Sequence, residues 1–305
     1  MSTRPAAAAP LNLTLRFGCL LRYEATGPAV LLLNLQVLPL RSQRLLGEQL
    51  VLGDRLPAEP FIDSHGNRVW RLILAPGAHE IRHDALVSVP AAFDNHDLAP
   101  AAPVSLDVLP PELFRYTLPS RYCDSDKLGN FAWQQFGRIE HGMPRVLAIS
   151  EWIHHNIEYR YLSGQPDLSA WDILQRGHGV CRDFAHLAVA LNRTFNLPTR
   201  YVTGHLPDVG CPDPEGHMDF HAYGEVYLGG QWFTTDARFH RPRIGRVKIA
   251  CGLDAVDGAF STIYGGANLV HFEVYAYQVA TDSVRLGDPV DLSRRLDNRV
   301  EVVGS

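Results

Sequence analysis

A cysteine at position 181 lies in the run Gly179-Val180-Cys181-Arg182-Asp183-Phe184, where a loop is predicted to become a helix. The first residue of a helix lies near unpaired backbone N–H groups and the positive end of the helix dipole. Both favour the thiolate, which is the nucleophilic form of cysteine. Most free cysteines are small buried hydrophobic residues, so this local setting is what distinguishes Cys181. The motif therefore predicts a nucleophilic thiol.

Two further residues are predicted to meet on one β-hairpin. The sequence Leu-Gly-Gly-Gln at 228–231 is typical of a two-residue turn, because glycine tolerates positive φ at both central positions. If Leu228 pairs with Gln231, then His221 and Asp236 are diagonal neighbours on the same face, with Cα atoms about 7–8 Å apart. The histidine can then take the thiol proton while the aspartate orients its ring. We therefore predict a catalytic triad of Cys181, His221 and Asp236.

The same register separates the two faces of the hairpin. One face is predicted to be apolar and to point into a core, and it carries Phe220, Ala222, Val226 and Leu228 against Phe233 and Thr235. The other face is predicted to be polar and to form the catalytic side. On that side, Glu225 and Arg238 are expected to form a supporting cross-strand pair.

A zinc site is the main alternative for these residue types. The candidate ligands are three groups of residues that lie close in sequence: His178, Cys181 and His186; His217, Asp219 and His221; and His154-His155. None of them forms a CxxC pair, and HExxH is absent. We therefore predict no metal and no cofactor. A zinc protein remains open, as does a non-catalytic interaction module with the same fold.

The elements that must position these residues change character along the chain. The first hundred residues show strand-like patterns and no helical period, which indicates a small β-sandwich-like or partly closed sheet. Its predicted strands are 11–17, 29–38, 69–74 and 85–89. Prolines at 100, 103, 110 and 111 mark a boundary. Beyond it, the patterns predict helices at 124–136, 144–157, 169–174 and 181–195, followed by strands at 199–206, 219–228 and 231–235.

Composition limits the remaining function classes. The 305 residues include 46% hydrophobic and 20% charged residues, with a formal net charge of -5, as in ordinary globular proteins. No basic stripe indicates nucleic acid or a membrane surface as a partner. The N-terminus lacks the apolar core of a signal peptide, and the five cysteines form no CxxC pair, so we expect a cytoplasmic protein with reduced thiols. The oligomeric state cannot be read from the sequence.

At its chemical motifs the chain resembles the bacterial transglutaminase-like family, which is related to papain-type cysteine hydrolases. The resemblance covers about residues 112–280. It rests on Gly179–Leu187, Arg200–Gly204, Asp219–Ala222 and Trp232–Arg238, and less sharply on Ser120–Cys123 and Pro242–Arg246. Two departures concern selectivity. Gly224 stands where many relatives have a bulky aromatic residue, and the segment Cys251–Asp254 lacks a charged residue often seen before that aspartate.

The resemblance implies an α+β fold, in which the helix bearing the cysteine packs on an antiparallel sheet, preceded by a small all-β domain. The expected units are 1–110, 112–282 and a tail at 283–305. The resemblance also implies a thioester acyl-enzyme, formed by Cys181 with His221 and Asp236, on a peptide, isopeptide or glutamine-type amide. We expect a peptide or protein substrate, with hydrolysis favoured over cross-linking. The backbone N–H of Cys181, with Gln175 or Trp171, is a candidate oxyanion donor.

Overall fold

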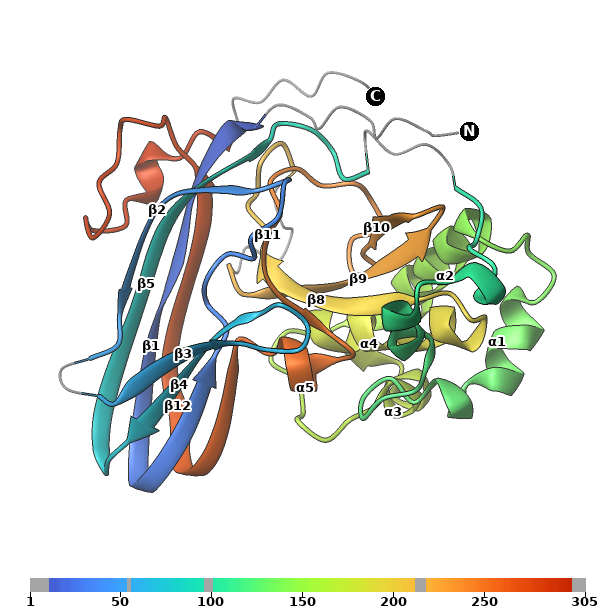
Figure 1. Cartoon of the computed structure of the whole chain (residues 1–305), viewed down its shortest axis with the longest axis horizontal. Coiled ribbons are helices and arrows are strands. Elements are labelled where there is room, and N and C mark those ends of the chain that lie inside the picture. Colours follow the sequence, from blue (N-terminus) through green and yellow to red (C-terminus); the bar gives the residue numbers. More distant parts are fainter. Residues whose placement is uncertain (1–10, 54–55, 96–100, 212–217, 298–305) are drawn as a thin grey trace.

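The computed structural model describes residues 11–53, 56–95, 101–211 and 218–297. Its elements form three layers, with a large curled sheet at one end, a smaller sheet in the middle and a group of helices at the other end (Figure 1). The mixture of helices with antiparallel sheets confirms the predicted α+β class.

The curled sheet contains six antiparallel strands in the order β2-β5-β1-β4-β3, and β12 pairs with β1 on its other side. The strands are β1 (Leu11–Leu33), β2 (Arg44–Val51), β3 (Ala58–Ile62), β4 (Arg68–Leu74), β5 (Gly77–Pro90) and β12 (Ser261–Gln278). From Cys19 to Ala25, buried residues of β1 alternate with less buried ones, as expected for a strand with one face on a core.

Two features of this sheet differ from the sequence-based expectations. The predicted strand 11–17 and the start of the predicted strand 29–38 belong to one continuous strand, β1. Between Ala25 and Ala29 a change of register takes the place of a turn. Strand β12, which lies within the predicted unit 112–282, joins the sheet of the N-terminal part instead. The predicted boundaries at 110 and 282 themselves stay predictions.

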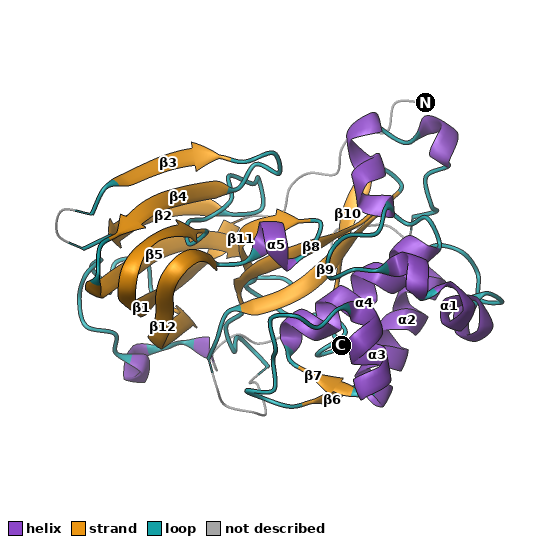
Figure 2. Ribbon diagram, turned by 90° about the horizontal axis from the view of Figure 1, so that it is seen from below, coloured by secondary structure: helices purple, strands orange, loops and turns teal. Residues whose placement is uncertain are grey.

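The second part of the chain surrounds a four-stranded sheet with the order β10-β9-β8-β11. Its strands are β8 (Thr199–His205), β9 (His221–Leu228), β10 (Gln231–Thr235) and β11 (Val247–Gly252), and a short pair joins β6 (Glu158–Tyr159) to β7 (His178–Gly179). The helices are α1 (Gly129–Phe136), α2 (Met143–Asn156), α3 (Ala170–Arg176), α4 (Cys181–Thr194) and α5 (Ala255–Gly258). In Figure 2, α1 to α4 lie together on one side of this sheet.

Two hydrophobic cores hold these layers together. One core joins buried residues of α2 and α4 to Val226, Leu228 and Phe233 of the hairpin. The other core joins the curled sheet to Phe220, Val247 and other residues of the second part. The hairpin packs on α4 through the first core, and Tyr223 on its other face packs with Leu38, Val202 and Cys251. Its position relative to α4 is therefore set by close packing.

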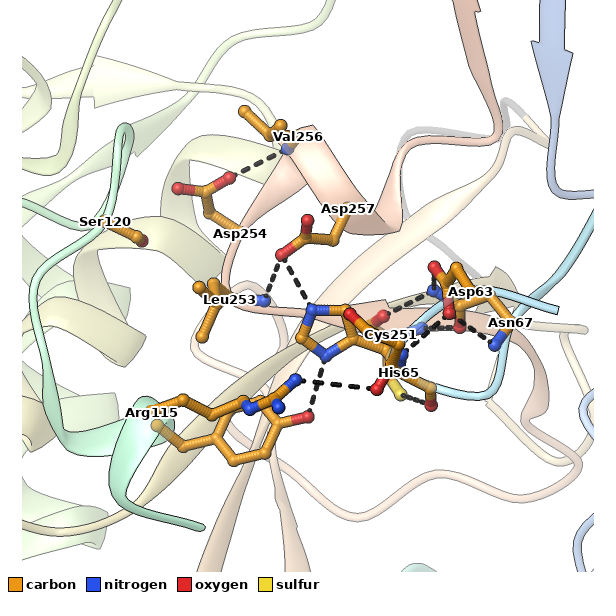
Figure 3. Close-up of polar contacts among 12 residues, drawn as sticks. Asp63, His65, Asn67, Arg115, Ser120, Cys251, Leu253, Asp254, Val256 and Asp257 are labelled. Atoms are coloured by element: carbon orange, nitrogen blue, oxygen red, sulfur yellow. Dashed lines mark hydrogen bonds and ion pairs between the residues drawn. The ribbon is translucent and has the colours of Figure 1, made fainter. Parts of the chain in front are cut away.

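A polar contact between the two parts is centred on the turn that joins β3 to β4 (Figure 3). The Asn67 side chain is fully buried and exchanges two hydrogen bonds with the backbone of Cys251, at 2.8 and 2.7 Å. His65 lies between Asp257 (3.2 Å) and the hydroxyl of Tyr116 (2.9 Å). These bonds fasten the turn to β11 and α5.

The segment after β12 also packs on the curled sheet. The Asp297 carboxylate accepts the N–H of Gln278 at 2.7 Å, and the Leu296 N–H is bonded to the Gln278 carbonyl at 2.9 Å. None of the helices in the described ranges is both long and apolar enough to cross a membrane.

Candidate active site

Cys181 is the first residue of α4, as the sequence predicts. The chain enters the helix through a cap in which the Asp183 carboxylate accepts the N–H of Val180 at 3.0 Å. The Cys181 sulfur lies 3.8 Å from the carbonyl oxygen of Phe220, the residue just before His221. The start of α4 is therefore held directly against the start of β9.

The surroundings of the sulfur oppose its ionisation. Burial raises the pKa of the Cys181 thiol to about 12, and the nearby Asp219 carboxylate adds to the increase. A hydrogen bond with the backbone of Ala222 acts in the opposite direction but is outweighed. The helix start alone therefore does not produce a thiolate, contrary to the sequence-based expectation. The resting side chain is a thiol that needs a base.

The register predicted for the hairpin is confirmed. Gln231 pairs with Leu228, and the pairing continues in step to Thr235 and Gly224. Gly229 and Gly230 have φ values of 55° and 90°, so the turn uses the positive φ that the sequence indicates. The hairpin contains no bulge along these pairs, and the parity that places His221 and Asp236 on one face is kept.

His221 and Asp236 are in direct contact. The Nε2 atom of His221 lies 2.8 Å from Oδ2 of Asp236, and both side chains are buried. Asp236 also forms an ion pair with Arg246 at 2.8 Å. Burial by itself raises the pKa of Asp236, but the charges of His221 and Arg246 and their hydrogen bonds hold it below its ordinary value. Because Nε2 faces this carboxylate, Nδ1 is the ring nitrogen left to exchange a proton with a thiol.

The predicted polar face of the hairpin differs from the expectation in two ways. It is covered, since His221, Tyr223 and Glu225 are all buried. Glu225 pairs with Arg200 at 2.7 Å and with Lys248, so the expected pair of Glu225 with Arg238 is wrong. The guanidinium of Arg238 lies over the ring of Tyr159 instead.

The proposed metal ligands are dispersed. His186 is fully buried, stacks on Tyr122, and accepts the N–H of Ala255 at 3.1 Å. His178 faces the carbonyl of Arg176 at 3.2 Å. His217 lies outside the described residues. Within residues 11–53, 56–95, 101–211 and 218–297, no group of three or more His, Cys, Asp or Glu side chains is arranged to hold a metal ion.

The two side chains considered for an oxyanion hole lie on α3. Trp171 is partly buried and packs against the helical core, whereas Gln175 is exposed. The backbone N–H of Cys181 is at the first position of α4, where a helix supplies no acceptor for it. The Cys181 N–H therefore remains a candidate hydrogen-bond donor to an oxyanion.

Two residues that lie next to the predicted triad were not identified from the sequence as its neighbours. Arg246 lies in the run Pro242–Arg246, which is part of the resemblance. Its ion pair with Asp236, ten residues earlier in the chain, cannot be predicted from the alternation of side chains along a strand. Asp219 lies two residues before His221, and the sequence indicates it as a candidate metal ligand and as part of the run Asp219–Ala222, but not as a neighbour of Cys181. The structure places it beside the thiol.

Comparisons with known proteins identify the family of this chain. The family model described as Transglutaminase-like superfamily matches residues 131–237, which contain all three residues of the predicted triad. A crystal structure from Cytophaga hutchinsonii, provisionally named a cysteine protease, is 33% identical in sequence. It covers 89% of this chain and 92% of its own chain, with a TM-score of 0.79. An uncharacterized protein of Mycobacterium leprae is 30% identical over 137 residues.

The chain belongs to the transglutaminase-like superfamily, a family of cysteine-hydrolase and acyltransferase type. The match to the Mycobacterium leprae protein covers 42% of this chain and 47% of that protein, so it extends over about half the length of this curated relative. The similarity to the Cytophaga hutchinsonii structure covers most of both chains, including the N-terminal part.

Proposed function

We propose that this protein is a cysteine-dependent enzyme that cleaves or transfers the acyl group of a peptide, isopeptide or glutamine-type amide. Cys181 is the nucleophile, His221 its base and acid, and Asp236 the group that orients the histidine. The observation that carries the proposal is the 2.8 Å contact between His221 Nε2 and Asp236 Oδ2, made on a strand whose preceding residue, Phe220, touches the Cys181 sulfur.

The chemistry begins from the thiol form of Cys181. Its proton passes to Nδ1 of His221 as the sulfur bonds to the carbonyl carbon of the amide. The C–N bond then breaks, and the departing amine takes the proton from His221. Water attacks the resulting thioester, gives the carboxylic acid and returns a proton to sulfur. An amine in place of water gives a new amide. Hydrolysis is favoured because water is the more abundant nucleophile.

Buried charge supports the role of the aspartate. Asp236 stays ionised because Arg246 balances its negative charge and because its carboxylate accepts a hydrogen bond from His221. An ionised carboxylate on Nε2 keeps the proton there in the neutral ring and stabilises the imidazolium that forms when the thiol is deprotonated. The ring is also confined by Phe239, whose centroid lies 5.3 Å away.

Trapping of the acyl-enzyme tests the proposal. The full chain is incubated with p-nitrophenyl acetate, and the peptide containing Cys181 is examined for an acetyl group by mass spectrometry. The same protein is then given glutamine-containing peptides, with ammonia and hydroxamate measured in the presence of hydroxylamine. We expect an adduct on Cys181 in the wild type and none in Cys181→Ser. Acetylation spread evenly over the cysteines would count against the proposal.

A second candidate, a non-catalytic interaction module, is favoured by one observation. Cys181 is partly buried and packs against Ala185, Tyr201 and Ala222, and burial raises the pKa of its thiol. A module of this kind would give no acyl adduct on Cys181 with any of these reagents, although it would remain folded. The same experiment therefore separates the two functions.

A further inference from the structure

Three carboxylates raise the pKa of Cys181, and they differ in how their charge is balanced. Asp183 is paired with Arg182 at 3.2 Å and also accepts the N–H of Val180. Asp236 is paired with Arg246 and His221. Each of these two carboxylates thus lies next to an arginine side chain, and Asp236 also contacts the imidazole of His221. Both raise the pKa of Cys181 less than Asp219 does.

Asp219 is the exception. Its carboxylate accepts the backbone N–H of Phe220 at 2.6 Å. Among the residues that the structure describes, no lysine, arginine or histidine side chain pairs with it. Burial raises the pKa of Asp219 to about 6, and the Phe220 N–H only partly offsets this. At neutral pH the site therefore contains a poorly solvated carboxylate whose charge no lysine, arginine or histidine of the described ranges balances.

The position of this charge ties it to the nucleophile. Phe220 holds both groups, because its N–H contacts the Asp219 carboxylate and its carbonyl oxygen lies 3.8 Å from the Cys181 sulfur. Tyr161 is part of the same neighbourhood, since Asp219 and Cys181 both contribute to the raised pKa of its hydroxyl after burial itself. Asp219 and Tyr161 are each partly exposed, so a ligand can reach them.

We propose that Asp219 is a specificity-determining residue that binds a positively charged group, an ammonium or guanidinium, carried by the substrate close to its scissile amide. The inference rests on the proposed function, whose substrate it narrows to cationic peptides or amines. A bound cation supplies the counter-ion that the described side chains around Asp219 do not provide.

The proposal has a consequence for activation of the thiol. A cation next to Asp219 offsets the part of the opposition to ionisation of Cys181 that comes from this carboxylate, so binding of the right substrate makes the proton easier to remove. By reciprocity, ionisation of the thiol strengthens binding of the cation. A neutral or anionic substrate gains neither effect.

Charged thiol reagents measure the electrostatic effect of Asp219 at the Cys181 sulfur and need no turnover of a substrate. (Trimethylammonium)ethyl methanethiosulfonate and sulfonatoethyl methanethiosulfonate each form a disulfide with the thiolate and release methanesulfinate. The second-order rate constant of each reagent is measured on the Cys181 peptide by mass spectrometry at low salt. The ratio of the two rate constants cancels any change in the thiolate fraction, and because the intrinsic reactivities of the reagents are constant, its change between variants reports the change in local charge.

We expect the cationic reagent to react faster in the wild type. In Asp219→Asn the ratio should fall about fivefold to tenfold, as expected for removal of one nearby, partly screened charge. Asp219→Glu should retain most of the preference. Asp167→Asn is the matched control, since it removes the same charge from an exposed residue in the segment between β6 and α3. Added salt should lower the wild-type ratio, which tests the field even if Asp219→Asn does not fold.

An unchanged ratio in Asp219→Asn, or an equal fall in Asp167→Asn, would overturn the assignment. Failure of the proposed function has a different signature. In that case the charge preference persists at Cys181, but neither p-nitrophenyl acetate nor a glutamine-containing peptide leaves an acyl group there. If an acyl-enzyme forms but shows no charge preference, the function stands and the cation subsite is rejected.

Discussion

At the scale of single residues, the site separates the two properties that a nucleophilic cysteine needs. Position is provided by the start of α4, which holds the sulfur against Phe220. Ionisation is not provided in the resting state, because burial and the Asp219 carboxylate keep the proton on sulfur. Residue types and their spacing in the sequence predicted the position. The ionisation state depends on the packing around the sulfur, which no sequence motif specifies.

Removal of the charge on Asp236 tests the orienting role at this scale. Asp236→Asn keeps the size of the side chain but gives an amide that does not stabilise the imidazolium form of His221. We expect acylation of Cys181 by p-nitrophenyl acetate to slow by roughly 10²- to 10⁴-fold, the range known for triads that lose this charge. The measurement is the rate of p-nitrophenol release at saturating ester.

Asp94→Asn is the control for that variant. Asp94 contacts the same arginine, with Arg246 Nε at 2.8 Å, and among the described residues it forms no hydrogen bond with His221. Its loss should leave the acylation rate within about tenfold of the wild type, since the triad charge is intact. Equal losses in the two variants would mean that Asp236 acts only by holding Arg246.

At the scale of elements, the hairpin was the most predictable part of the molecule. Two glycines and a period-2 pattern determined the pairing of β9 with β10 as far as Thr235. The long strand β1 was predicted as two strands because Thr26-Gly27-Pro28 has the composition of a turn. Strands β2 and β3 were missed because their side chains are mostly exposed and give no hydrophobic alternation.

Buried Glu225 on β9 makes the stability of this sheet sensitive to acid. Burial raises the pKa of Glu225, but Lys248 and Arg200 more than compensate and lower it from 4.5 to about 2. Because the folded pKa lies below the unfolded value, the stabilisation is fully present above about pH 4.5 and is lost as pH falls towards 2. The shift corresponds to about 3 kcal/mol in the free energy of unfolding.

Urea unfolding of Glu225→Gln at about pH 7 and about pH 3 checks this expectation. The variant should be less stable at the higher pH, and its disadvantage should shrink at the lower pH. Glu59→Gln is the control, because the Glu59 ion pair with Arg71 lies on exposed side chains and is worth less than about 1 kcal/mol. A deficit for Glu225→Gln that does not depend on pH would contradict the linkage.

At the scale of the whole molecule, the turn between β3 and β4 fastens the curled sheet to the part that carries the triad. This contact was not predictable, because Asp63–Asn67 has the composition of an ordinary polar turn and its partner Cys251 is 184 residues away from Asn67. The overall class was predictable, since it depends on the local patterns of helices and strands.

Replacement of Asn67 by leucine tests the importance of this contact. The change leaves the buried N–H and carbonyl of Cys251 without their partner, so we expect a loss of about 2–5 kcal/mol in the free energy of unfolding. Faster hydrogen exchange at the Cys251 amide should accompany it. Asn130→Leu, at an exposed position in α1, should change the free energy by less than about 0.5 kcal/mol. If Asn67→Leu lowered the free energy of unfolding no more than Asn130→Leu does, the contact between Asn67 and Cys251 would not stabilise the fold.

The pairing of β12 with β1 also determines when the curled sheet can form during synthesis of the chain. Strand β1 is made long before its partner along Leu15–Leu33, which is the segment Ser261–Gln278. Tyr23 and Ser261, for example, are 238 positions apart and meet only after both have been synthesised. Until then the nascent chain presents a long unpaired strand edge, which is prone to misassembly. Contacts so distant in sequence also slow folding. Cys181, His221 and the β9–β10 hairpin can therefore all have left the ribosome before β12 is available to pair with β1 in the curled sheet.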